Sequence, residues 1–160
     1  MWGRWKFVFS KNVRRSILVA QNQAIADGHL FVGTQYLLFS LVHEGSVPEL
    51  LQQLNVPLNQ LKEEVIKLIQ SNADANVKPD WKKATLTAGS KKVLELAAKE
   101  AQTLRTSRNT VEPEHVLLAL LHFKKDLPAS YTLLNNHGVK LMEARLQVKT
   151  ILQNRDRKVA

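Results

Sequence analysis

The sequence of 160 residues contains no cysteine, few acidic residues and no long apolar run. Without cysteine the fold holds neither a disulfide nor a zinc site built on thiolates, which fits a reducing compartment. The longest apolar runs, such as residues 116–121, are far too short to span a bilayer. The first residues also lack the uninterrupted apolar core of a secretory signal. We therefore expect an intracellular, cytoplasmic protein with no membrane partner.

Acidic residues are scarce, with 14 Asp and Glu against 23 Lys and Arg and a formal net charge of +9. The basic excess is concentrated in residues 1–15, 78–92 and 154–160. Such clusters are typical either of a solvated surface or of a site that attracts polyanions. With so few acidic residues, the sequence offers few candidates for the two catalytic carboxylates of a hydrolase. No Ser/His/Asp arrangement stands out either. We therefore expect no enzymatic activity, no catalytic residue and no cofactor.

The sequence does contain apolar residues at helical spacing almost throughout. Hydrophobic residues make up 44% of the chain, which is enough for a packed interior. The first of four apolar stripes before residue 71 comprises Val13, Ile17, Ala20 and Ala24. No stretch alternates as a strand would, so no strand is expected. Residues 71–85 lack periodicity and contain Pro79, which is typical of a linker.

The second half of the chain repeats the first. Phe9-Ser10 aligns with Leu86-Thr87, 77 residues later, and residues 33–36 align with residues 112–115, 79 residues later. Each copy predicts a long helix, a loop, a second helix, a short helix and a final helix. Four short helices bury a poor core alone, so we expect the copies to pack about a pseudo-twofold axis. The predicted ranges are a domain over 5–153, with repeats at about 9–70 and 86–153 around the linker, and a basic tail over 154–160.

Three short motifs that could hold a ligand each lack a required residue. Residues 28–34 resemble the start of a phosphate loop, but threonine stands where a lysine should reach the phosphates. A zinc-protease helix that begins at His43 needs a second histidine where Val47 stands. His115 and His122 could share a helix face, yet no third ligand lies at a suitable spacing. No metal site is therefore predicted.

The two loop-to-helix junctions, residues 33–36 and 112–115, are the best candidates for a binding site. Pro113 has the fixed φ suited to the first helical position, which places Glu114 in the first turn. There the carboxylate either stabilises the helix N-terminus or holds a cation beside an anion bound by free backbone N–H groups. The sequence leaves both roles open.

These features resemble the amino-terminal repeat domain of Clp-family unfoldases. The matching residues are Phe9-Ser10, Arg14-Arg15, Gly33-Thr34-Gln35, His43-Glu44-Gly45, Thr87, Lys91-Lys92-Val93-Leu94-Glu95-Leu96 and Glu112-Pro113-Glu114-His115-Val116-Leu117-Leu118. The resemblance covers about residues 5–153 and implies an all-α fold, a duplicated four-helix repeat of about eight helices. In that family the domain precedes ring-forming ATPase modules and receives substrates and adaptor proteins.

The resemblance also implies that the junctions bind the substrate or adaptor. The implied residues are Gly33, Thr34, Gln35, Glu112, Pro113 and Glu114. In the relatives coupled to the Clp protease, the acid of each Gly-Thr-Glu-His junction binds the guanidinium of phosphorylated arginine. Here Gln35 offers no charge, Pro113 lacks an N–H donor and Glu112 would repel phosphate. These departures argue against phosphoarginine and favour general docking of substrates or adaptors.

Two functions of different classes follow from the sequence. The first is a monomeric, non-catalytic binding module that works with Clp ATPase or protease subunits, as a stand-alone accessory protein or as a domain of a larger ATPase. The start at Met1 favours the stand-alone form. The alternative is a nucleic-acid-binding helical protein, in which Trp2 and Trp5, interleaved with Arg4 and Lys6, stack on bases. The same two tryptophans could instead anchor the first helix to the core.

Overall fold

The computed structural model describes residues 8–70, 84–105, 110–122 and 129–159, and in these ranges the chain forms eight helices and four short strands. The helices are α1 (Lys11–Ala26), α2 (Thr34–His43), α3 (Val47–Gln53), α4 (Leu58–Gln70), α5 (Ala88–Leu104), α6 (Pro113–His122), α7 (Ala129–Asn136) and α8 (Leu141–Val159). The strands are β1 (Val8–Phe9), β2 (Phe31–Val32), β3 (Thr85–Leu86) and β4 (Thr110–Val111). Each half has its helices in the predicted order, and the all-α repeat is confirmed.

The first helix of each repeat begins at the same kind of residue. Ser10 caps α1, and its hydroxyl oxygen accepts a hydrogen bond from the backbone N–H of Val13 at 3.2 Å. Thr87 caps α5, and its hydroxyl oxygen accepts from the backbone N–H of Ser90 at 3.1 Å. Such caps satisfy N–H groups that a helix leaves unpaired at its start. The sequence alignment equates these two positions, so the repeat extends to individual hydrogen bonds.

The strands correct the expectation that the chain has none. β1 pairs in parallel with β4, and β2 pairs in parallel with β3. Each pair joins the strand before the first helix of one repeat to the strand before the second helix of the other. This exchange is what a pseudo-twofold axis requires. Two residues are too few to show an alternating pattern, so the sequence did not predict these strands.

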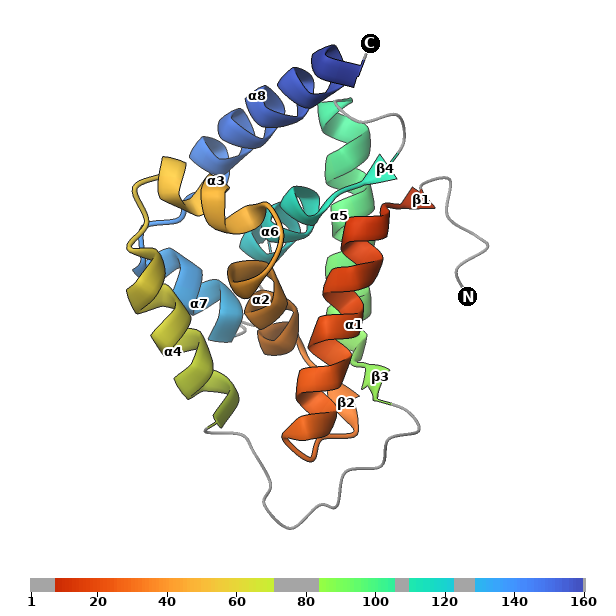
Figure 1. The fold of residues 1–160 in the computed structure, drawn as a ribbon, viewed down its shortest axis with the longest axis vertical. Helices are drawn as coiled ribbons and strands as arrows, with labels where there is room; N and C mark the ends of the chain where they lie inside the picture. Colours follow the sequence, from red (N-terminus) through yellow and green to blue (C-terminus); the bar gives the residue numbers. More distant parts are fainter. Residues whose placement is uncertain (1–7, 71–83, 106–109, 123–128, 160) are drawn as a thin grey trace.

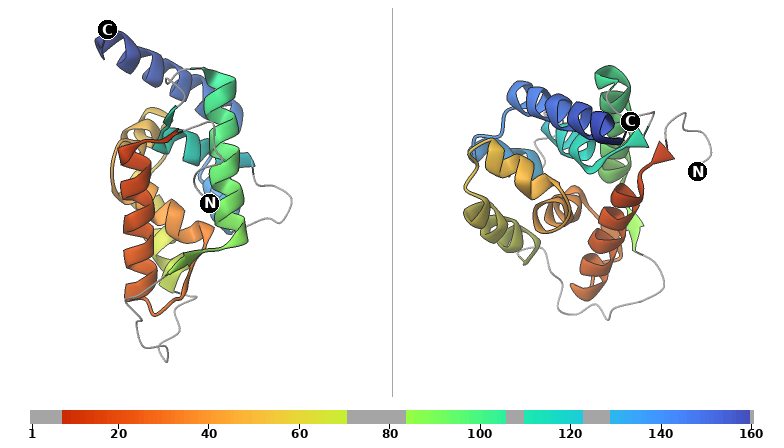
Figure 2. Two further views of the ribbon diagram at one scale, coloured as in Figure 1. Left: turned by 90° about the vertical axis from the view of Figure 1, so that its right-hand side faces the viewer. Right: turned by 45° about the horizontal axis from the view of Figure 1, so that its top comes forward.

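The central helices are α2 and α6: α1 and α5 lie on one side of them, and α3, α4 and α7 lie on the other (Figure 1 and Figure 2). Every residue of α6 from Pro113 to Leu121 is buried, as are six residues of α2. A helix that is apolar around most of its circumference has to be covered on all sides. The other helices provide that cover. The first residues of α2 and α6 follow β2 and β4 in the chain.

α8 lies across the end of the molecule where β1 pairs with β4 (Figure 1). It continues to Val159, so residues 154–159 of the predicted tail are helical. The predicted domain boundaries stay predictions. The described residues do not include Trp2, Trp5 or residues 71–83 of the linker. Within the described residues, no helix combines the length and apolar character needed to cross a membrane.

Candidate functional site

Each predicted junction lies where a central helix begins, and the other repeat completes it. Beside the first junction, the backbone N–H of Thr87 donates to the carbonyl of Val32 at 3.1 Å. Beside the second, the backbone N–H of Ser10 donates to the carbonyl of Val111 at 3.0 Å. The two junctions lie near β2 and β4, at opposite ends of the molecule (Figure 1). The structure therefore brings each junction together with the start of the other repeat's first helix, and keeps the two junctions apart.

The first junction carries no charge on its predicted residues. Gly33 is the N-cap of α2, and the Gln35 side chain folds back over it, because a Cβ added to Gly33 would lie 2.3 Å from Gln35 Oε1. The Thr34 hydroxyl accepts a hydrogen bond from the Ser130 hydroxyl of α7 at 3.0 Å. All three predicted residues are thus packed against their own chain.

The second junction buries its acid. Pro113 is the first residue of α6, as its fixed φ predicted. Glu112 is half-buried, and its backbone N–H donates to Nδ1 of His115 at 2.9 Å. Glu114 is fully buried in the first turn of α6. A carboxylate in such a position needs hydrogen bonds and a compensating charge.

Two other elements supply what Glu114 needs. The hydroxyl of Ser46, at the start of α3, donates to Glu114 Oε1 at 2.6 Å. The Arg155 guanidinium of α8 donates to the same oxygen at 2.6 Å. Oε2 of Glu114 is buried and has no hydrogen-bond partner. The carboxylate therefore holds a cation, one of the two roles that the sequence left open, and the cation comes from this chain.

Burial decides the ionisation of this junction. Burial lowers the pKa of His115 to about 4, although the charges of Glu114 and Glu100 act in the opposite direction. His115 is therefore neutral at pH 7, and since its Nδ1 accepts the N–H of Glu112, the proton lies on Nε2. Burial also raises the pKa of Glu112. A hydrogen bond from Ser10 opposes this rise in pKa, and the charge of Glu114 adds to it.

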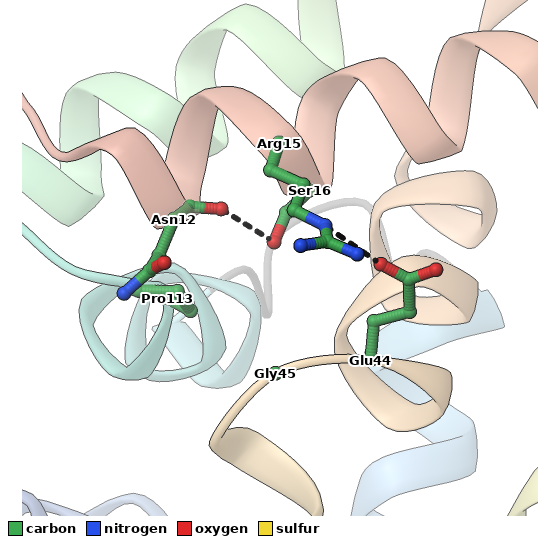
Figure 3. A pocket seen from close by; sticks show the side chains of 6 residues that line it. All are labelled: Asn12, Arg15, Ser16, Glu44, Gly45 and Pro113. Carbon is green, nitrogen blue, oxygen red and sulfur yellow. Dashed lines mark hydrogen bonds and ion pairs between the residues drawn. The ribbon is translucent and has the colours of Figure 1, made fainter.

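A cavity of about 220 Å³ opens beside the second junction (Figure 3). It is lined by Asn12, Arg15, Ser16, Glu44, Gly45 and Pro113. Arg15 Nε and Glu44 Oε2 form an ion pair of 3.4 Å, with 75% and 39% of their side chains exposed. Such an exposed pair contributes little and exchanges easily for the charges of a partner. The cavity therefore offers an amide and both charges to a docking side chain.

The turn at Gly45 links the cavity to the buried acid. Gly45 has φ +75°, a left-handed conformation that side chains rarely adopt. The turn places Glu44 at the cavity and Ser46 against Glu114. The two neighbours of Gly45 therefore contact the cavity and the carboxylate respectively.

Ser46 was not predicted as a site residue, and Arg155 was predicted to lie in a basic tail. A signal for Arg155 was present, because it follows Val148 and Leu152, two buried residues of α8, at helical spacing. That spacing shows which face of a helix a residue shares, although it does not name the partner. Ser46 had no signal, because its partner is 68 residues away in the sequence.

We expect Ser46→Ala to lower the free energy of unfolding by about 1.5 kcal/mol, because it removes one hydrogen bond to a buried carboxylate. Ser46 makes no side-chain capping bond to α3, so the loss reports on Glu114. Urea unfolding measures the change. Ser16→Ala is the control, because its hydroxyl bonds an exposed backbone carbonyl. Equal losses in the two variants would contradict the assignment.

Within the described ranges, no group of three or more His, Cys, Asp or Glu side chains is placed to hold a metal ion. His115 is fully buried beside Glu114, whereas His122, further along α6, contacts Glu100 of α5. His43 Nδ1 lies 3.0 Å from the carbonyl of Phe39. The three histidines considered as metal ligands therefore have different surroundings. His115 lies in the core, and His43 and His122 lie at its edge.

Residues 8–136 match the family described as Clp repeat (R) N-terminal domain. The chain is 34% identical over 154 residues to chaperone protein ClpB of Oceanobacillus iheyensis. It is 32% identical over 154 residues to the negative regulator of genetic competence ClpC/MecB of Bacillus subtilis. Each alignment covers 95% of this chain and 17% of the relative.

The fold also matches solved structures. The N-terminal domain of Hsp104 from Candida albicans has a TM-score of 0.70 at 17% identity, with 88% of each chain covered. At that identity the likeness shows the fold alone, and the family rests on the sequence matches. The chain belongs to the Clp repeat N-terminal domain family.

Proposed function

We propose that this chain is a non-catalytic docking module of a Clp chaperone or protease system, which receives substrate or adaptor proteins. The family and the two relatives named as ClpB and ClpC/MecB support the Clp system. The observation that carries the docking role is the second junction, where residues of both repeats surround a cavity with exposed charges of both signs. A cavity of this size admits one side chain, which is the scale of peptide recognition rather than of a large ligand.

The charges at the second junction favour an unphosphorylated partner. Glu112 and Glu114 both carry carboxyl groups there, and Pro113 has no N–H to give a phosphate. A phosphate placed at Glu112 and Pro113 would meet like charge and no backbone donor, whereas the exposed Arg15–Glu44 pair offers both charges to an ordinary side chain. The proposal is therefore the docking of ordinary protein segments, in line with the departures from the phosphoarginine-binding junctions.

Nucleic-acid binding is less well supported by the arrangement of the basic residues. Lys11 and Arg14 lie at the start of α1, and Lys91 and Lys92 lie at the start of α5. These two starts are at opposite ends of the molecule (Figure 1). These two clusters therefore do not form one continuous track for a phosphate backbone, whereas the basic residues at the end of α8 lie at the same end of the molecule as the start of α1 (Figure 1).

The test is direct binding. The purified chain is immobilised and offered the Clp ATPase and Clp protease subunits of the same organism, and separately unfolded casein. We expect capture of at least one of these proteins. Glu44→Gln, at the cavity, is expected to weaken that binding about fivefold, because it removes a rim charge worth about 1 kcal/mol.

Glu64→Gln is the matched control, because Glu64 pairs with Lys67 on α4, away from the cavity. It should bind as the unaltered chain does. Failure to capture the Clp subunits and casein alike would overturn the docking role. Equal binding by Glu44→Gln and Glu64→Gln would show that the second junction is not the binding surface. The monomeric state, the cytoplasmic location and the choice between accessory protein and ATPase domain stay predictions.

A further inference from the structure

Two exposed apolar side chains distinguish the first repeat from the second. Leu18 on α1 is 55% exposed and Phe31 on β2 is 63% exposed. The repeat alignment equates them with Glu95 on α5, 77 residues later, and Thr110 on β4, 79 residues later. Glu95 is exposed as Leu18 is, so the second repeat adopts the same fold with a charged residue at this position. The fold therefore does not require an apolar side chain at either position.

Leu18 and Phe31 belong to the side of the molecule where α1 meets the strands β2 and β3. Gln21 follows Leu18 by three residues on the same helix face, and its Nε2 donates to the carbonyl of Ala84 at 3.3 Å. Thr85, the next residue, is the β3 partner of Phe31. β2 packs against α1 and lies beside its last turns (Figure 1). The two exposed apolar side chains therefore flank one contact between the helix and the strands.

The same face of α1 begins with two exposed cations. Lys11 and Arg14 precede Leu18 by seven and four residues, and this spacing places all three on one helix face. α1 contains no acidic residue, and in the ranges that the structure describes neither cation is paired with a carboxylate. A cation near the start of a helix meets the positive end of the helix dipole. Helix stability therefore does not account for these two cations, and the position equivalent to Lys11 in α5 is Ala88.

The four side chains that form this surface, which we call the α1 strip, are Lys11, Arg14, Leu18 and Phe31. The cationic end of the strip adjoins the cavity of the second junction, whose lining includes Asn12 and Arg15 of α1 (Figure 3). From Lys11 to Leu18 the helix rises about 10 Å. An extended chain covers that length with about three residues. The α1 strip therefore has the dimensions of a short peptide segment.

We propose that the α1 strip docks an acidic segment of a partner protein that also carries an apolar side chain. Carboxylates of the segment pair with Lys11 and Arg14, and its apolar side chain packs against Leu18 and Phe31. Charge complementarity selects this partner, because a purely apolar segment would leave both cations unpaired and a purely acidic one would leave both apolar side chains in water. The proposal rests on the docking function and names the class of segment that is docked.

The experiment uses a fluorescein-labelled peptide of eight residues as the probe. Leucine and phenylalanine form its centre, and one glycine and two glutamates flank the centre on each side, so that either chain direction presents carboxylates to the cations. Fluorescence anisotropy measures its binding to the full chain. One control peptide has glutamine in place of the glutamates, and the other has serine in place of leucine and phenylalanine. Each control is expected to bind at least about fivefold more weakly than the probe, and added salt should weaken the probe more than the glutamine peptide.

Variants of the chain locate the binding of the probe. Leu18→Glu introduces the residue type of the equivalent position in α5 and is expected to weaken binding at least about tenfold. Leu146→Glu is the matched control, because Leu146 is an exposed leucine of α8, away from the α1 strip. Lys11→Gln should weaken binding about threefold, the loss expected for one exposed charge, whereas Lys149→Gln on α8 should not. All four positions are exposed, so these changes leave the core intact.

Equal affinity of Leu18→Glu and Leu146→Glu for the probe would overturn the proposal, as would equal binding of the glutamate and glutamine peptides. A single-stranded oligonucleotide that binds as tightly as the probe would identify a nucleic-acid surface instead. A dimer in analytical ultracentrifugation that Leu18→Glu dissociates would identify a second copy of this chain as the occupant. If casein or Clp subunits are captured in any of these cases, the docking function stands and only the α1 strip is lost. If the probe binds as expected and neither is captured, the docking function fails and the α1 strip stands.

Discussion

Arg145→Ala is expected to lower the free energy of unfolding by about 3 kcal/mol. Arg145 of α8 donates from Nε to Glu100 Oε2 at 3.1 Å and from an Nη nitrogen to Oε1 at 2.6 Å. His122 of α6 contacts the same Oε1. These contacts join three helices through one carboxylate of which 4% is exposed.

The size of the effect follows from the burial of Glu100. Burial alone would raise the pKa of Glu100, but the hydrogen bonds and charges of Arg145 and His122 outweigh it and hold the pKa below its usual value. Removing Arg145 takes away two of the three side-chain contacts of the buried Glu100 carboxylate. Such a loss lowers stability by more than the intact ion pair contributes to it. We place the cost at the lower end for a buried pair, because His122 remains and Arg145 is 30% exposed.

Urea unfolding measures this prediction. Lys149→Ala, an exposed change one turn further along α8, is the control and should lie within about 0.5 kcal/mol of the unaltered chain. The double variant Glu100→Gln with Arg145→Ala should be more stable than Arg145→Ala alone, because no buried charge is then left unpaired. A single-variant loss below about 1 kcal/mol would contradict the role of this cluster.

Acidification from pH 7 to pH 4 is expected to cost the protein about 3 kcal/mol through His115 alone. The pKa of His115 is about 4 in the folded chain, against an ordinary value of 6.5, because burial opposes its positive charge. The unfolded chain therefore takes up the proton first as the pH falls. The stability contributed by neutral His115 is present above pH 6.5 and is lost as the pH falls towards 4.

The range from pH 7 to pH 5 isolates this group from most carboxyl titration. Over that range we expect a loss of about 2 kcal/mol through His115. His115→Asn places an amide oxygen near the position of Nδ1, where it can accept the Glu112 N–H without titrating. This variant is less stable at pH 7, yet its stability should change less between pH 7 and pH 5.

His137→Asn is the control for the acid prediction. His137 is half-buried after α7, and its Nδ1 lies 2.9 Å from the carbonyl of Leu133. Its free energy of unfolding should follow that of the unaltered chain between pH 7 and pH 5. Parallel curves for the unaltered chain and His115→Asn would show that the buried histidine does not set the acid stability.

The sequence predicted the helical part of this fold well because the relevant signals are local. Apolar spacing located α1 to α4, and Pro113 marked the start of α6. Ser10 and Thr87 aligned in the repeat and prove to be equivalent caps. Periodicity and capping depend on neighbours within one or two turns, so they can be read without knowing the tertiary structure.

The paired strands and the contacts of the candidate site could not be predicted in the same way. The parallel pairing of β1 with β4 joins residues about a hundred positions apart, and neither strand is long enough to show a pattern. The assignment of Gly33 to Gln35 and of Glu112 to Glu114 to a binding site stays a prediction. The structure shows that the two junctions differ, since the first is neutral and the second holds a buried acid.

Acidic residues are scarce in the composition, and two of them, Glu100 and Glu114, are buried and form ion pairs with arginines of α8. By itself the sequence determined a duplicated all-α domain without disulfides, since helical spacing and repeat alignment are properties of the chain. Only the tertiary structure decided where the charges meet, because the partners of Glu114 lie 68 and 41 residues away. A buried carboxylate is stabilised by the few groups that packing brings within hydrogen-bonding distance. The local sequence pattern does not indicate which groups these are.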